Sequence, residues 1–304
     1  MINNQVLKEK LLNLCQKIYC HRILEETVRF GKNADDTIEF AKRNRLAHFL
    51  ALEYSQLFEK DKKWNDICRS LIAEYDEYKK KIKNSIKKIQ QILNGKEFMI
   101  VKTFSSFPHL TGDIDVLVKD LKDEKFPIHI EDQDLWPIHI ENKISWMGAD
   151  AVSNDFAWHN TQRFVFEGLD FLVPNPQLDT AIRLGHMPFE VAHIKLGELL
   201  HIYNQAFLFD WAILENEAKL MGWPKTFKKM SDILELLHQV LFKTPFLRKS
   251  KMSISPKYKI EFPFELPFSV LAGGVIEKRA WKKIYGARFV IRERINSWIR
   301  RNIY

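Results

Sequence analysis

The spacing of apolar residues changes twice along this chain, and these changes limit the folds that it can adopt. Before Gly95 the apolar residues recur every three or four positions, as they do over 75–93, which is typical of amphipathic helices. Over 98–173 they alternate or form short runs, which is typical of strands. From about Pro176 the helical spacing returns. The order predicts an α+β fold rather than a regularly alternating parallel sheet.

The same changes divide the chain into three predicted parts. We expect an N-terminal helical domain over 1–95, a mixed-sheet core over 96–175, and a C-terminal helical domain with a basic tail over 176–304. With 46% hydrophobic and 28% charged residues, the composition is that of an ordinary globular protein. No apolar run approaches the roughly 18 residues that a membrane span needs.

The cysteines and the N-terminus indicate where such a protein resides. Cys15, Cys20 and Cys68 cannot all pair, and none has a metal-binding Cys-x-x-Cys spacing. The N-terminus lacks the apolar segment of a signal peptide. We therefore expect free thiols in a cytoplasmic protein with no membrane partner.

Positive charge is concentrated near the C-terminus. The segment 278–304 holds nine Lys or Arg and one acid, Glu293, whereas the whole chain has a net charge of +8. A second group of lysines lies on the polar faces of the helix predicted over 75–93. Basic segments of this kind favour RNA phosphates as a partner, although a solvated helix face gives the same pattern.

The stretch Asp113-Ile-Asp-Val-Leu-Val118 carries the residues best suited to chemistry. Residues two apart in a strand face the same side, so the carboxylates of Asp113 and Asp115 should lie together. Two adjacent carboxylates repel each other, and a hard divalent ion such as Mg²⁺ or Mn²⁺ relieves that repulsion. The alternative is an exposed strand start after the Gly112 turn. A second pair, Asp132 and Asp134, falls in a polar segment where we expect a loop.

The residues before this acidic strand carry a family resemblance. A short apolar strand ending at Val101 leads into Lys102, then into a polar segment over 105–112, and then into the acidic strand. This order resembles the polymerase-β-like nucleotidyltransferase superfamily, and it is most similar to uncharacterised families related to toxin enzymes of bacterial toxin–antitoxin systems. The resemblance implies a small sheet flanked by helical domains. It also implies Mg²⁺-dependent transfer of NMP from an NTP to an acceptor hydroxyl.

The resemblance also implies nucleotide contacts from the turn after the first strand. We expect Lys102, Thr103, Ser105 and Ser106 to approach the triphosphate, with Lys143 as a further contact. The family has glycine in this turn, where its missing Cβ lets the backbone come close to phosphate. This chain has Lys and Thr instead, so the serines or Thr103 would have to replace that function.

The third carboxylate of the family is less easily placed. When the chain is aligned on Trp146, the family's aspartate falls on His139. Imidazole is a poor ligand for Mg²⁺, so we predict that Glu141, two residues later on the same face, completes the site. Glu131 is the alternative.

Further elements follow from the same patterns. Two copies of Pro-Ile-His-Ile-Glu, at 127–131 and 137–141, predict a pair of strands, and strands are also expected on either side of Glu167 and Gly168. Helices are predicted over 177–184, 190–203, 209–221, 226–241 and 281–303. At the start of the second of these and just before it, His186, Glu190 and His193 have the spacing of one helical face.

Two functions from different classes are consistent with these features. The first is an enzyme that transfers a nucleotidyl group to RNA, such as a tRNA 3′ end, with an antitoxin-like protein as a further partner. The second is a catalytically inactive nucleotidyltransferase-fold module that binds a nucleotide or RNA. The absent glycines of the turn favour the second, and the paired aspartates favour the first.

Overall fold

The computed structural model describes residues 34–55, 62–119, 128–146, 149–243, 246 and 260–277. These residues form a mixed six-stranded sheet and several helices, which confirms the predicted α+β class. The basic tail with its helix predicted over 281–303 lies outside the described residues, as do Cys15 and Cys20. Cys68 is a buried free thiol.

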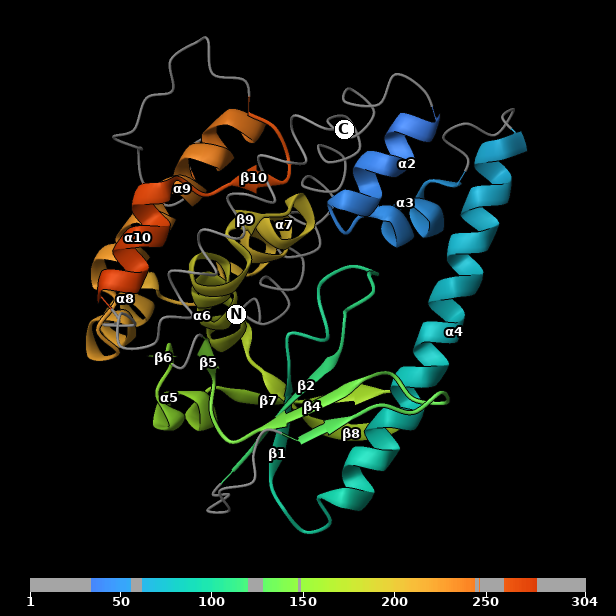
Figure 1. Cartoon of the computed structure of the whole chain (residues 1–304), viewed down its shortest axis with the longest axis horizontal. Helices are drawn as coiled ribbons and strands as arrows, with labels where there is room; N and C mark the ends of the chain where they lie inside the picture. The colour runs from blue at the N-terminus through green and yellow to red at the C-terminus, as the bar shows by residue number, and fades with distance from the viewer. Residues whose placement is uncertain are drawn as a thin grey trace, which may run out of the picture.

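The N-terminal helices precede the sheet in the chain (Figure 1). They are α2 (Ala34–Arg43), α3 (Ala47–Glu53) and α4 (Lys62–Ile92). The long α4 packs its first half against α2 and α3 and its second half against the sheet. Gly95 follows α4 with φ +76°, a left-handed conformation that glycine adopts without steric cost, as predicted for a helix end.

The central sheet has the strand order β3-β4-β2-β1-β8-β7. Its strands are β1 (Phe98–Val101), β2 (Ile114–Val118), β3 (Ile128–Ile130), β4 (Ile138–Glu141), β7 (Thr161–Phe166) and β8 (Leu169–Pro174). Neighbours pair antiparallel except for β2 with β4 and β1 with β8, which are parallel. A separate ladder joins β5 (Ser145–Trp146) to β6 (Ala149–Asp150).

Both predicted strand pairs are confirmed. The two Pro-Ile-His-Ile-Glu copies form β3 and β4, which pair antiparallel with His129 opposite His139. The strands β7 and β8 form a hairpin whose two turn residues, Glu167 and Gly168, both have positive φ. Positive φ at both central residues gives the turn a twist that matches the strands of a hairpin.

Helices return after β8, as the sequence predicted, but with an interruption. The elements after β8 are α6 (Pro176–His186), η2 (Met187–Val191), β9 (His193–Ile194), α7 (Leu196–Gln205), α8 (Trp211–Leu220), α9 (Pro224–Phe242), β10 (Phe264–Glu265) and α10 (Phe268–Glu277). One short helix, α5 (Asn154–His159), precedes β7. The turn η2 is a π-helix.

The helix predicted over 190–203 is therefore wrong at its start. Ala192 has φ +58°, a left-handed conformation that ends η2. His193 then pairs with Glu265 as part of the short ladder between β9 and β10, and α7 begins only at Leu196. As a consequence, His186, Glu190 and His193 do not share one helical face.

The sheet lies between two apolar cores. On one face the second half of α4 packs against alternate strand residues, including Ile114, Val116 and Ile140. On the other face Met99 and Leu117 join the larger core, which contains residues of α2, α3, the first half of α4 and the helices from α6 onward. These later helices gather on the side of the sheet away from the second half of α4 (Figure 1). Strand alternation therefore turns the remaining residues of β2 and β4 away from α4.

None of the described helices is both long enough and apolar enough to cross a membrane.

Candidate active site

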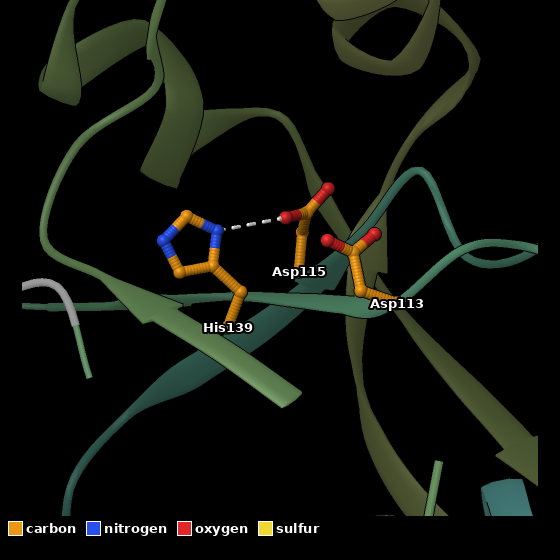
Figure 2. A group of neighbouring side chains, drawn as sticks. All are labelled: Asp113, Asp115 and His139. Carbon is orange, nitrogen blue, oxygen red and sulfur yellow. Dashed lines mark hydrogen bonds and ion pairs between the residues drawn. The ribbon is translucent and has the colours of Figure 1, made fainter. Parts of the chain in front are cut away.

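The two aspartates of the acidic stretch lie side by side at the start of β2 (Figure 2). Asp115 is in the strand, Asp113 directly precedes it, and the intervening Ile114 is buried against α4. Both carboxylates therefore project from the face opposite α4, as strand parity predicted. One oxygen from each, together with a ring nitrogen of His139, lie within 4.8 Å of one another.

His139 reaches this pair because β2 and β4 run parallel and place it opposite Asp115. Its Nδ1 lies 3.3 Å from Asp115 Oδ1, and its Nε2 lies 3.3 Å from Glu141 Oε1. The hydrogen bond to Asp115 raises the pKa of His139, and the charges of Glu141, Asp115 and Asp113 add to this, although burial acts in the opposite direction. The raised pKa favours the protonated form of His139, whose charge offsets part of the negative charge of these carboxylates.

Glu141, the predicted third ligand, lies on the same face of β4 but outside the group of three. His139, the residue that aligns with the aspartate of the family, lies next to Asp115. Glu131, the alternative, follows β3 and is exposed. The identity of the third ligand stays a prediction, and Glu141 Oε1 lies 3.3 Å from His139 Nε2.

Lys102 neutralises the other side of Asp115. Its Nζ lies 2.7 Å from Asp115 Oδ2. Burial would raise the pKa of Asp115, but the hydrogen bond from His139 and the charge of Lys102 outweigh it, so that the pKa is lowered. Lys102 has φ +58°, a conformation that costs a non-glycine residue energy. Glycine adopts this backbone conformation without steric cost.

These residues line a pocket of about 300 Å³ between the sheet and the helices. Lys143, predicted as a nucleotide contact, lines it too, as do Lys102 and Glu141. The helical side of the pocket contributes residues that sequence reasoning missed. They are Arg45, Ile182, Arg183, Met187 and Glu198, and His186, which the sequence did single out, lines the pocket with them. No local motif marks them, because they come from the α2–α3 connection, α6, η2 and α7.

The remaining predicted nucleotide contacts lie elsewhere. Thr103 is buried, and its hydroxyl donates to the Val101 carbonyl at 3.2 Å. Ser105 Oγ donates to the Phe107 carbonyl at 3.0 Å. Neither these two residues nor Ser106 is among the described residues that line the pocket with the aspartates. The structure thus brings Lys102 and Lys143 to the acidic pair but not Thr103, Ser105 or Ser106.

Ser106 belongs to a buried network with the order of a hydrolase triad. Ser106 Oγ lies 3.0 Å from His201 Nδ1, and His201 Nε2 lies 2.6 Å from Asp179 Oδ2. However, the backbone N–H of Ser106 donates to the same Nδ1 at 2.9 Å and occupies the lone pair that a general base needs. The network is therefore an anchor that ties the loop after β1 to α6 and α7.

Asp179 holds this anchor together from α6. It accepts from His201 Nε2 and from Arg183 Nε, at 2.6 and 2.8 Å. Burial would raise the pKa of Asp179, but the charge of Arg183 and the hydrogen bond from His201 reverse the effect and hold it well below its usual range. Arg183 also donates from Nη2 to the Phe104 carbonyl at 3.1 Å, which fixes the loop next to the pocket.

Comparisons of the chain with protein-family models, with curated proteins and with solved structures give no match. The residues of the pocket and their geometry therefore indicate the function.

Proposed function

We propose that this protein is a Mg²⁺- or Mn²⁺-dependent nucleotidyltransferase that transfers NMP from an NTP to an acceptor hydroxyl. The observation that carries the proposal is the pair Asp113 and Asp115, side by side on one face of β2 in a pocket that also holds Lys102, Lys143 and Arg45. Such a site combines carboxylates for a divalent cation with cations for a triphosphate. These are the two requirements of nucleotidyl transfer.

The donor set fits a divalent cation. Two carboxylates match the oxygen ligands that Mg²⁺ prefers, and Mn²⁺ also accepts an imidazole nitrogen, which His139 would offer when metal binding displaces its proton. A bound cation would neutralise charge that develops on the phosphates and activate the attacking hydroxyl. Asp113 and Asp115 would hold that cation. Lys102 Nζ, next to Asp115, is placed to contact a phosphate of the nucleotide.

The chemical class of the acceptor is inferred from the basic segments of the chain rather than from the residues of the pocket. The basic segment 278–304 and the lysines of α4 favour RNA, including a tRNA 3′ end, as the source of the hydroxyl. A small mixed sheet with helices before and after it is the arrangement that the resemblance to the nucleotidyltransferase superfamily implies. An antitoxin-like partner remains a prediction from that resemblance, and a cytoplasmic location remains a prediction from the cysteines.

A second candidate is a module that binds a nucleotide without turning it over. The observation that favours it is the pairing of Asp115 with both Lys102 and His139, at 2.7 and 3.3 Å. Two cationic side chains satisfy this carboxylate without a metal ion. A nucleotidyltransferase-fold site that had lost its activity would keep its carboxylates paired with cationic side chains, as Asp115 is here.

A transfer assay separates the two candidates. The protein is incubated with Mg²⁺ or Mn²⁺, each labelled NTP and total RNA, and label is followed into RNA. Asp113→Asn/Asp115→Asn should abolish transfer, because it removes both carboxylate charges. Asp132→Asn/Asp134→Asn is the matched control, since this Asp-x-Asp pair is exposed in the β3–β4 connection, away from the pocket.

The outcomes are distinct. Transfer that persists in Asp113→Asn/Asp115→Asn contradicts the site assignment. Nucleotide binding without transfer to RNA, protein or aminoglycoside acceptors supports the binding module instead of the enzyme.

A further inference from the structure

One charged group on the helical side of the pocket has an unused hydrogen-bonding atom. Glu198, in the first turn of α7, lines the pocket and is 6% exposed. Its Oε1 accepts from Arg45 Nη1 at 2.9 Å. Its Oε2 is buried and has no hydrogen-bond partner within the part of the chain that the structure describes. A buried carboxylate oxygen without a donor is costly, so its retention in a pocket points to a donor from a ligand.

The chain builds this position with specific backbone contacts. The Asn44 side-chain oxygen accepts from Leu196 N at 3.1 Å, and the Asn44 carbonyl accepts from Gly197 N at 3.0 Å. These two bonds satisfy amide groups that the start of α7 leaves free. A Cβ on Gly197 would lie 2.8 Å from the Asn44 carbonyl oxygen, so only glycine permits the approach. The α2–α3 connection is thereby fixed against α7 next to Glu198.

Arg45, the partner of Glu198, is held in an unfavourable backbone conformation. Its φ is +61°, in the left-handed region that residues other than glycine rarely adopt. Lys102, on the sheet side of the same pocket, has φ +58°. Left-handed non-glycine residues persist where the surroundings fix them, and they concentrate at ligand sites. The ion pair is thus positioned on the Arg45 side by the fixed backbone of Arg45 and on the Glu198 side by the contacts at the start of α7.

The charge state of Glu198 defines what it can bind. Burial would raise its pKa, but Arg45, with His186, Lys195 and Arg183, outweighs burial and lowers it. Glu198 is therefore ionised at neutral pH, and an ionised carboxylate only accepts hydrogen bonds. Phosphate oxygens, which are acceptors and negatively charged, are excluded from Oε2. A neutral hydroxyl or amine is the complementary group.

We propose that Glu198 Oε2 accepts a hydrogen bond from a hydroxyl or amine of the nucleotide bound in this pocket, which makes Glu198 a residue that determines nucleotide specificity. The inference rests on the proposed function. The cations around Asp115 take the triphosphate, and Glu198, from the helical side, selects the sugar or the base. Both a ribose hydroxyl and an exocyclic amine have the required chemistry, and the experiment distinguishes them.

The test is a binding comparison with Glu198→Gln. Arg45 can donate only to the amide oxygen, so the amide NH₂ takes the place of Oε2 and turns the acceptor into a donor. Affinities for the four ribonucleoside triphosphates are measured by calorimetry with Ca²⁺ in place of Mg²⁺. The tightest of them is then compared with its 2′-deoxy and 3′-deoxy forms and with an analogue lacking the base amine.

In the wild-type protein, one of these analogues should bind about ten- to a hundredfold more weakly than the parent nucleotide, the range for a hydrogen bond to a charged group. In Glu198→Gln the parent nucleotide should fall to the affinity of that analogue, whose own affinity should not change. The analogue affected identifies the donor as sugar or base.

Two controls keep the result interpretable. Glu217→Gln alters an equally buried glutamate outside the residues that line the pocket, and it should leave the discrimination intact. Thermal unfolding and Mn²⁺ binding establish that Glu198→Gln is folded and keeps its acidic pair. If Glu198→Gln affects the parent and every analogue equally, or affects none, the inference is overturned while the proposed function stands. If no nucleotide binds to the wild-type protein, both are overturned.

Discussion

At the residue scale, Asp115 has a cation on each side, and the two cations differ in what they can do. His139 is fixed by β4, whereas Lys102 reaches Asp115 through a long flexible side chain at the end of β1. A divalent cation that binds Asp115 must compete with Lys102 for this carboxylate. The positive charge of Lys102 would, in contrast, favour the binding of a triphosphate. Lys102 therefore has opposite effects on the two ligands.

We expect Lys102→Met to strengthen Mn²⁺ binding about fivefold, which corresponds to about 1 kcal/mol for a partly buried ion pair, and to weaken NTP binding. Both affinities are measured by calorimetry. Lys119→Met, which removes a lysine paired with Glu97, is the control and should change neither. Unchanged Mn²⁺ and NTP affinities in Lys102→Met would contradict the assigned position of Lys102.

His109 gives a pH-dependent prediction. Burial lowers its pKa to about 3, and the charges of Arg183, Arg45 and His201 act in the same direction. The unfolded chain takes up a proton near the ordinary histidine pKa of about 6.5, so that stability is lost as the pH falls from there toward 3. This group contributes a loss of up to about 1.4 kcal/mol per pH unit.

We expect His109→Gln, which keeps a polar group near Ser105, to show a shallower fall in the free energy of unfolding between pH 6 and pH 4.5. Urea unfolding at several pH values measures the difference. Parallel curves for the two proteins would mean that His109 is not held neutral in the folded state.

Individual residues were predictable only where local pattern decides their position. The alternation around Ile114 and Val116 placed Asp113 and Asp115 on one face, and the structure confirms it. Arg45 could not be found in this way, because its position depends on contacts with α7, more than a hundred residues later.

At the element scale, local signals predicted hairpins better than helix boundaries. The Glu167-Gly168 turn and the repeated Pro-Ile-His-Ile-Glu segments contain the information for their own pairing. The break between η2 and α7 does not, because it depends on pairing between β9 and the distant β10. Apolar spacing continues through the break, so periodicity alone predicts one helix.

The junction between the α2–α3 connection and α7 gives a prediction about an element. Gly197→Ala should destabilise the protein by about 1–3 kcal/mol, because the added Cβ meets the Asn44 carbonyl at 2.8 Å and backbone must move. Thermal or urea unfolding measures the loss. We also expect weaker NTP binding, since the movement displaces Arg45 and Glu198.

Gly273→Ala is the matched control. The residue lies in α10, and its added Cβ would meet nothing closer than 3.5 Å among the described residues. Alanine should stabilise the helix by up to about 1 kcal/mol. Equal stability of Gly197→Ala and the wild-type protein would show that the approach to Asn44 is not tight.

At the scale of the whole molecule, the pocket is assembled from segments that are far apart in the sequence. The sheet supplies the acidic pair and His139, and the connection at Arg45 and the helices α6 and α7 supply the other side. The order of helices and strands predicted the α+β class of the fold. It did not predict which helical residues face the aspartates, because that depends on how the layers pack.

The central claim is that Asp113 and Asp115 bind a divalent cation in this pocket, and Mn²⁺ titration in the presence of an NTP tests it most directly. The wild-type protein and Asp132→Asn/Asp134→Asn should bind Mn²⁺ with equal affinity, whereas Asp113→Asn/Asp115→Asn should lose binding while remaining folded. Mn²⁺ binding that is unchanged in Asp113→Asn/Asp115→Asn, or that is absent from the wild-type protein, would contradict the account.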